Sequence, residues 1–258
     1  MIIDTHVELP QGEDSLDVLD DALEFSGISS VIIVQREPSN SSNQACLNLA
    51  KKSDGLICGV VAWAPITNKQ LLKAQLSTDN QENMVCGYVV DIHREEAREW
   101  SSNEDAHYGA RLIHKTVKPL ELILQPAQVR GVLPFLDAHP DMPIVLDHCL
   151  GEAAESNNAW RQLLREIGRR PHVFYRMSGL APVANADTAC KATESVKEVF
   201  DAALDGFGTQ RLIYGSGWPV TPARYPVWLN TVDNLIHTLS PDEQADIFGG
   251  NAAGIYGV

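Results

Sequence analysis

The sequence predicts an α/β fold, a single (β/α)8 TIM barrel spanning residues 1–258. Eight apolar runs typical of buried strands alternate with helix-type segments, at roughly thirty residues per unit, which indicates parallel strands joined by helical crossovers. The length of 258 residues also suits such a barrel, which typically needs about 250. No G-x-G-x-x-G turn follows the first apolar run, and this disfavours an open dinucleotide-binding sheet.

Each expected strand is a short run of apolar, often β-branched residues, as is typical of parallel strands covered on both faces. The segment Ser-Val-Ile-Ile-Val-Gln at residues 30–35 shows the pattern most clearly. We expect the strands at residues 1–8, 30–35, 56–63, 84–92, 120–125, 143–148, 172–178 and 211–214.

The expected helices rest on apolar residues at helical spacing and on terminal signals. Thr67 is placed as an N-cap, Pro126 suits the first turn of a helix, and Gly27 suits a helix stop. The helices are expected at residues 14–25, 44–52, 67–76, 94–118 with a polar interruption at 101–105, 126–139, 160–169, 193–207, 225–239 and 241–247. Residues 39–43 are expected to form a polar loop.

Charge and composition exclude several function classes. The formal net charge of −14 disfavours nucleic acid and anionic membrane surfaces as partners, because both attract basic faces. The five cysteines are scattered without a C-x-x-C motif, so neither a disulfide framework nor a zinc knuckle is expected. No apolar run is long enough to cross a bilayer, and we expect a cytoplasmic protein.

Polar side chains gather where the expected strands end. In a barrel, the carboxyl ends of the strands form the face that carries the chemistry. His6 and Glu8 are two residues apart on the first strand and should project to the same side. The other polar residues at strand ends are Asp91, His93, Gln125, Asp147, His148, Arg176, Ser178 and Ser216.

Several motifs, in order along the chain, resemble the amidohydrolase-related (amidohydrolase 2) family, whose TIM-barrel hydrolases include sugar lactonases. They are Met1-Ile2-Ile3-Asp4-Thr5-His6, Val145-Leu146-Asp147-His148, Met177-Ser178-Gly179-Leu180, Arg211 to Trp218-Pro219, and Gly250-Asn251-Ala252-Ala253 with Tyr256. The resemblance implies hydrolysis of a lactone or related carbonyl compound, often with help from a divalent metal.

The chain departs from this family pattern at five positions. Glu8 stands in place of the second histidine of the first strand, and Gly217 in place of the aspartate that transfers protons. Val89 replaces an arginine, Arg176 a lysine, and Gly254 an arginine of the closing helix.

From these residues we predict a site with two open alternatives. In the first, His6, Glu8 and His148 hold zinc or manganese, and Glu8 and His148 are catalytic. Glu8 would then replace the missing base if burial raised its pKa. In the second, Glu8 only accepts from a histidine or pairs with Arg176 or another cation, and no metal is held.

The remaining site residues are assigned to substrate or to structure. Arg176, Ser178, Ser216 and Trp218 are predicted to bind a small, oxygen-rich cyclic ester. Asp147 is expected to point away from His148 and to anchor a neighbouring loop. Asp91 and His93 are either a second ligand pair or ordinary loop polarity.

The sequence is compatible with two functions, each favoured by a different set of residues. The strand-end ionisable groups favour a divergent hydrolase, because buried charges cost stability unless they are paired. The losses at Gly217, Val89 and Gly254 favour a barrel that no longer catalyses and serves as a small-molecule binder or partner subunit. Pairing of two copies through exposed helices is expected of barrels of this kind.

Overall fold

The structure, a computed structural model, describes residues 1–9, 15–147, 158–178, 189–219 and 225–258. Eight strands form one parallel sheet in the order β1 to β8. The sheet closes where Val7 pairs in parallel with Trp218, and where the amide of Gly217 donates to the carbonyl of His6 at 2.9 Å. The predicted barrel is confirmed.

The strands lie where the apolar runs predicted them, although each is shorter than its predicted range. They are β1 (Ile3–Val7), β2 (Ser30–Val34), β3 (Ile57–Trp63), β4 (Val85–Asp91), β5 (Leu120–Ile123), β6 (Ile144–Asp147), β7 (Val173–Met177) and β8 (Leu212–Tyr214). Most of them therefore end just before or at their polar residues, and those residues begin the loops of one face.

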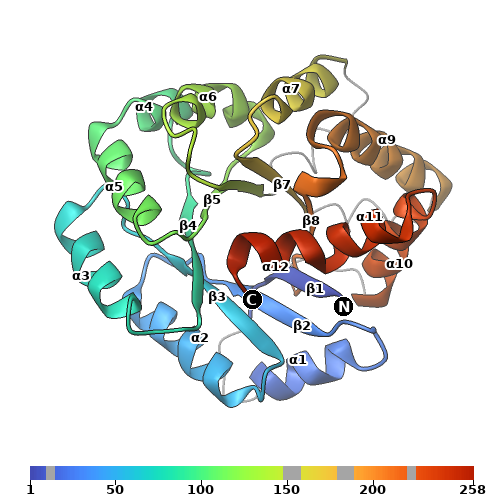
Figure 1. The fold of residues 1–258 in the computed structure, drawn as a ribbon, viewed down its shortest axis with the longest axis horizontal. Coiled ribbons are helices and arrows are strands. Elements are labelled where there is room, and N and C mark those ends of the chain that lie inside the picture. Colours follow the sequence, from blue (N-terminus) through green and yellow to red (C-terminus); the bar gives the residue numbers. More distant parts are fainter. Residues whose placement is uncertain (10–14, 148–157, 179–188, 220–224) are drawn as a thin grey trace.

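Most of the helices form a ring around the strands (Figure 1). The α-helices are α1 (Ser15–Leu23), α2 (Asn40–Lys52), α3 (Lys69–Asp79), α4 (Ala97–Ser101), α5 (Glu104–His114), α6 (Val129–Asp137), α7 (Asn158–Gly168), α9 (Ala189–Phe207), α10 (Tyr225–Ile236), α11 (Pro241–Ala245) and α12 (Asn251–Tyr256). The 3-10 turns η1 (Pro126–Gln128) and η2 (Thr209–Arg211) and the π-helical turn η3 (Asp246–Gly250) complete them.

Three helix starts differ from the prediction because other side chains cap them. Ser39 caps α2 by accepting from the amide of Ser42, so the expected loop at 39–43 is mostly helical. Asn68, and not Thr67, caps α3. Asn103 accepts from two amides at the start of α5 and so divides the expected 94–118 helix into α4 and α5.

One end of the barrel is covered by α12, which lies across the strands in Figure 1. Ala252 and Tyr256 of this helix pack in the same buried cluster as inward residues of several strands, among them Ile3, Val61 and Val145. The opposite end carries the loops that follow the strands. Within the described ranges, we find no helix that is both long and apolar enough to span a membrane.

Candidate functional site

His6 lies fully buried on β1, with a carboxylate at each ring nitrogen. Its Nδ1 is 2.5 Å from Asp147 Oδ2, and its Nε2 is 3.0 Å from Glu8 Oε1. Burial alone would lower the pKa of His6, but the charge and hydrogen bond of Asp147, with the hydrogen bond to Glu8, raise it to about 9. In the protein without a bound metal, the imidazole is therefore protonated at neutral pH and donates from both nitrogens.

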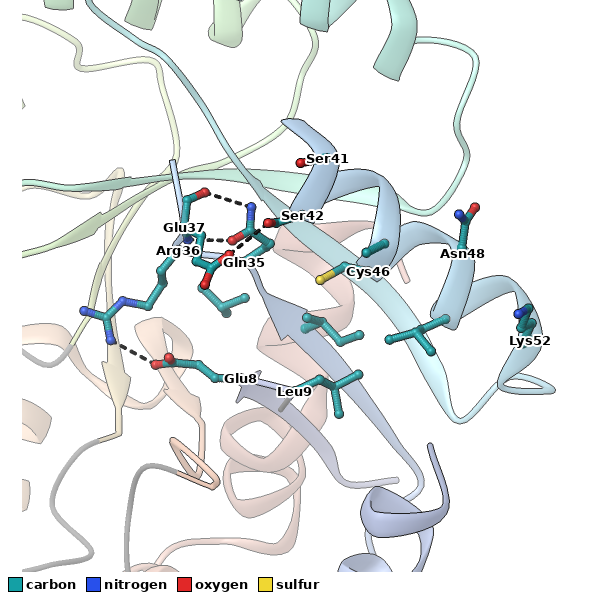
Figure 2. A pocket seen from close by; sticks show the side chains of 14 residues that line it. Glu8, Leu9, Gln35, Arg36, Glu37, Ser41, Ser42, Cys46, Asn48 and Lys52 are labelled. Carbon is teal, nitrogen blue, oxygen red and sulfur yellow. Dashed lines mark hydrogen bonds and ion pairs between the residues drawn. The ribbon is translucent and has the colours of Figure 1, made fainter. Parts of the chain in front are cut away.

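Glu8 is shared between His6 and an arginine that the sequence analysis did not single out. Arg36 follows β2, and its guanidinium donates to Glu8 Oε1 at 2.9 Å and to Asp91 Oδ2 at 2.8 Å. Figure 2 shows the contact of Arg36 with Glu8. Arg36 therefore links the ends of β1 and β4 across the mouth of the barrel.

The pKa of Glu8 moves in the direction opposite to the one predicted. Burial tends to raise it, but the hydrogen bond from His6 and the charges of His6 and Arg36 outweigh burial and lower the pKa to about 2. The expectation of a raised pKa is wrong, and Glu8 is a weak base in this arrangement. The weighed alternative, in which Glu8 pairs with a histidine and a cation, matches these contacts, with Arg36 as the cation in place of Arg176.

Arg176 lies at the centre of a buried network inside the barrel. Its guanidinium donates to both oxygens of Glu121, with a distance of 2.8 Å from Nη1 to Oε2, and to Asp147 Oδ2 at 3.1 Å. Nε donates to the hydroxyl of Thr5 at 2.9 Å, and Nη2 also contacts the hydroxyl of Tyr256. Each guanidinium nitrogen thus has a protein partner, and the predicted role of Arg176 in substrate binding stays a prediction.

Glu121 is the main residue of this network that the sequence analysis missed. It is fully buried on β5, and it accepts from Arg176 and from the Tyr256 hydroxyl, the latter at 2.5 Å. A lone carboxylate inside the apolar run Leu-Glu-Leu-Ile was the available signal. A buried carboxylate needs a cation, and the buried Arg176 supplies it.

Asp147 connects this network to His6, so its expected role as a loop anchor is wrong. It is fully buried, and it contacts His6, the guanidinium of Arg176 and the hydroxyl of Ser178. β6 ends at Asp147 with the side chain inside the barrel. His148, predicted as a ligand and catalytic residue, lies outside the described residues.

Ser216, Gly217 and Trp218 form the seam between β8 and β1. The amide of Ser216 donates to Asp4 Oδ1 at 2.8 Å, its hydroxyl donates to the carbonyl of His6 at 3.3 Å, and the amide of Trp218 donates to Ser216 Oγ at 3.0 Å. Gly217 has φ +70°, a conformation that favours glycine, although aspartate tolerates it better than most residues. Substrate binding by Ser178, Ser216 and Trp218 stays a prediction.

Asp91 and His93 do not come together as a ligand pair through their side chains. Asp91 Oδ1 accepts from the backbone amide of His93 at 2.9 Å, while the ring of His93 contacts Gln125 at 3.0 Å. The other oxygen of Asp91 binds Arg36. The alternative of loop polarity describes His93 better, and Asp91 belongs to the charged mouth.

Two of the predicted metal ligands have the chemistry for a divalent cation. With Nδ1 held by Asp147, a neutral His6 would present Nε2 as a ligand, an arrangement common around metal-bound histidines. Glu8 Oε1 lies beside this nitrogen. Across the described ranges, however, no three His, Cys, Asp or Glu side chains gather in a group that could hold a metal. The donors therefore fit part of a metal site, which a further ligand would have to complete.

Comparison with known proteins settles the family. A sequence profile of the amidohydrolase family matches residues 8–258. The chain belongs to the amidohydrolase family. This agrees with the resemblance drawn from its motifs.

The similar proteins include lactonases. The chain is 28% identical over 253 residues to an L-fucono-1,5-lactonase of Burkholderia multivorans, covering 93% of this chain and 84% of that protein. A second L-fucono-1,5-lactonase, from Burkholderia ambifaria, is 27% identical, with 92% and 83% covered. A crystal structure of an amidohydrolase from Burkholderia multivorans with bound zinc superimposes with a TM-score of 0.89 at 26% identity, covering 100% of this chain and 99% of that one.

Proposed function

We propose that this amidohydrolase opens the ring of a small, oxygen-rich lactone at the barrel mouth around His6. The observation that carries the proposal is the position of His6, fixed by Asp147 on one side and facing Glu8 on the other. The similarity to L-fucono-1,5-lactonases supports a sugar-acid lactone as the substrate class.

The reaction adds water to the lactone carbonyl and breaks the ring carbon–oxygen bond, giving a hydroxy acid. Negative charge develops on the carbonyl oxygen, and fixed hydrogen-bond donors at that point stabilise the transition state. Without a bound metal, the imidazolium of His6, which donates to Asp147 and Glu8, and the guanidinium of Arg36 supply the positive charge of the described mouth. Asp147 holds the imidazole of His6 in place, and Arg176 in turn holds Asp147.

Position 217 offers no carboxylate, so the proton of the attacking water needs another acceptor. Glu8 and Asp91 have side chains that are 22% and 26% exposed, and both contact Arg36. The lowered pKa of Glu8 disfavours it as this base. Asp91 is therefore our first candidate for the proton acceptor.

A second form of this proposal has a divalent metal, zinc or manganese, and a neutral His6 in place of the protonated one. His6 and Glu8 would hold the metal, with His148 as the third ligand that the sequence predicts. A bound metal would polarise the carbonyl oxygen and lower the pKa of a bound water. The zinc in the similar Burkholderia multivorans structure supports this form.

The second candidate function is a small-molecule binder without catalysis. Gly217 favours it, because the family's aspartate is missing there, and so does the engagement of Glu8 by two cations. Both candidate functions place the small molecule at the same barrel mouth, and they differ only in whether the protein hydrolyses it.

A lactone panel separates the two functions. Protein purified without chelator is assayed for metal content and for proton release from 1,5-lactones and 1,4-lactones of sugar acids. If the protein is an enzyme, we expect it to hydrolyse at least one lactone, and we expect the rate to fall at least a hundredfold in His6→Ala. The control His237→Ala changes an exposed histidine and should behave as wild type. Thermal stabilisation by a sugar acid without turnover of any lactone would contradict the enzyme and support the binder.

A further inference from the structure

A cavity of about 850 Å³ opens beside the barrel mouth, at the edge of the network around His6. It lies between the ends of β1 and β2 and one face of α2 (Figure 2). Glu8 and Arg36 line it as well, so the cavity is continuous with the charged mouth. Its volume falls in the range of pockets that enclose drug-sized ligands, about 300–1,000 Å³.

The cavity is elongated because its helical wall runs along most of α2. Residues 41, 45, 48, 49 and 52 contribute to the lining, and their spacing places them on one side of the helix. From Ser41 to Lys52 the helix rises about 16 Å at 1.5 Å per residue. Figure 2 shows Arg36 towards one end of this wall and Lys52 at the other.

The middle of the cavity offers mainly apolar surface. Leu9, Ala45 and Leu49 line it, together with Cys46. Burial, with a further contribution from the charge of Glu37, raises the pKa of the Cys46 thiol to about 11, so the sulfur is neutral at physiological pH.

Several polar side chains of the lining already have partners within the protein. The Gln35 amide donates to Asn43 Oδ1 at 2.8 Å and to the carbonyl of Glu37 at 2.9 Å. The hydroxyl of Ser42 donates to Glu37 Oε2 at 2.9 Å. These donors are already used within the protein, so a ligand lying against Gln35 and Ser42 gains mainly apolar contact.

A free donor lies at the mouth end of the cavity. Arg36 Nε is buried and has no hydrogen-bond partner among the described residues, although both other nitrogens of this guanidinium are bonded. A buried unsatisfied donor costs free energy unless a ligand or water accepts from it. Nε has almost no accessible surface in this conformation, so the guanidinium would have to turn towards the junction before an ester oxygen or a carboxylate could accept from this nitrogen.

We propose that this cavity is a subsite for the substituent of the substrate, and that the chain takes lactones bearing a linear alkyl or acyl tail. The ring lies at the mouth beside Arg36, and the tail lies along Ala45, Cys46 and Leu49 of α2. The inference rests on the proposed lactone hydrolysis and adds lactones with an apolar tail to the sugar-acid lactones proposed for that same mouth.

The test is a series of 1,4-lactones that carry methyl, butyl and octyl substituents. We expect kcat/KM to rise about twofold per added methylene, roughly half the factor for full burial of each group. Ala45→Trp, at an exposed position in the middle of the wall, should remove this rise. Asn40→Trp, exposed on the same helix but outside the lining, is the matched control and should keep the rise.

The outcomes distinguish this inference from the proposed function. Turnover of the methyl lactone with no gain for the octyl lactone would overturn the subsite and leave lactone hydrolysis standing. Calorimetry with the ring-opened octyl hydroxy acid gives a reading that needs no turnover. Binding to wild type and Asn40→Trp, lost in Ala45→Trp, supports the subsite even if no lactone is hydrolysed, whereas equal binding to all three overturns it.

Discussion

Two arginines show how differently the inside and the mouth of this barrel are built. Arg176 is fully buried, and every nitrogen of its guanidinium contacts a protein group. The side chain of Arg36 is 26% exposed, spans two carboxylates and keeps one buried N–H without a described partner. The first is saturated and serves the fold, whereas the second retains capacity for a ligand.

The largest expected loss of stability comes from replacing Arg176, the arginine whose nitrogens are all hydrogen-bonded. Arg176→Met leaves the buried carboxylates of Glu121 and Asp147 without their cation, and it should lower the free energy of unfolding by about 3–5 kcal/mol. Urea denaturation measures the change. The double variant Arg176→Met, Glu121→Gln should recover part of it, and a loss below about 1 kcal/mol in the single variant would show that the network does not hold the barrel.

The buried side chain of His139 is a contrasting case, because the fold keeps it neutral instead of pairing it with an opposite charge. Nε2 of His139 shares a hydrogen bond with Nδ1 of His107 at 2.9 Å, and the His139 ring lies tilted against Phe135. Burial, and then the charge of His107, lower the pKa of His139 to about 4. Since the unfolded chain binds this proton near pH 6.5, stability is present above that pH and is lost as the pH falls from about 6.5 towards 4.

The loss attributable to His139 should reach about 3 kcal/mol near pH 4, at 1.36 kcal/mol per pKa unit. Urea denaturation between pH 7.5 and 4 measures it as the difference between wild type and His139→Phe. If both proteins lose stability in parallel over this range, His139 is not the group that titrates.

Tyr256→Phe removes a single hydroxyl from the buried network around Arg176 and leaves its charges in place. Its hydroxyl donates to Glu121 and contacts Arg176, and hydrogen bonds to charged groups contribute about 1.5–3 kcal/mol. We expect the free energy of unfolding to fall by about 2 kcal/mol. Tyr108→Phe, which changes a tyrosine outside the barrel core, serves as control, and equal effects of the two variants would remove Tyr256 from the network.

The smallest effect on stability is expected at Arg36. Arg36→Met breaks two partly exposed ion pairs, and such pairs contribute about 0–1 kcal/mol. Lactone turnover should nevertheless fall at least tenfold, because the donors at the mouth are lost. Arg36→Lys should recover part of the rate, and a variant that is destabilised but fully active would reverse the assignment of the two arginines.

The fold followed from the sequence because the buried strands repeat at regular intervals. The neighbourhood of His6 and Glu8 was also predictable, since residues two apart on a strand share a side, and their side chains do meet at 3.0 Å. These relations need only local spacing along the chain.

The partners across strands were harder to predict. Asp147 and His148 are adjacent, and assigning the inward face requires knowing where β6 ends, because one residue of slip exchanges the faces. Arg36 was overlooked although it directly follows the expected second strand. Its partners, Glu8 and Asp91, come from other strands, so only the closed barrel shows that the three residues meet.

The most direct test of this account is the rate at which a sugar-acid 1,5-lactone opens in the presence of wild-type protein and of His6→Ala, measured by proton release at neutral pH. The account predicts catalysis well above the spontaneous rate by the wild type and a loss of at least a hundredfold in the variant. Equal rates for the two proteins would contradict a catalytic mouth centred on His6.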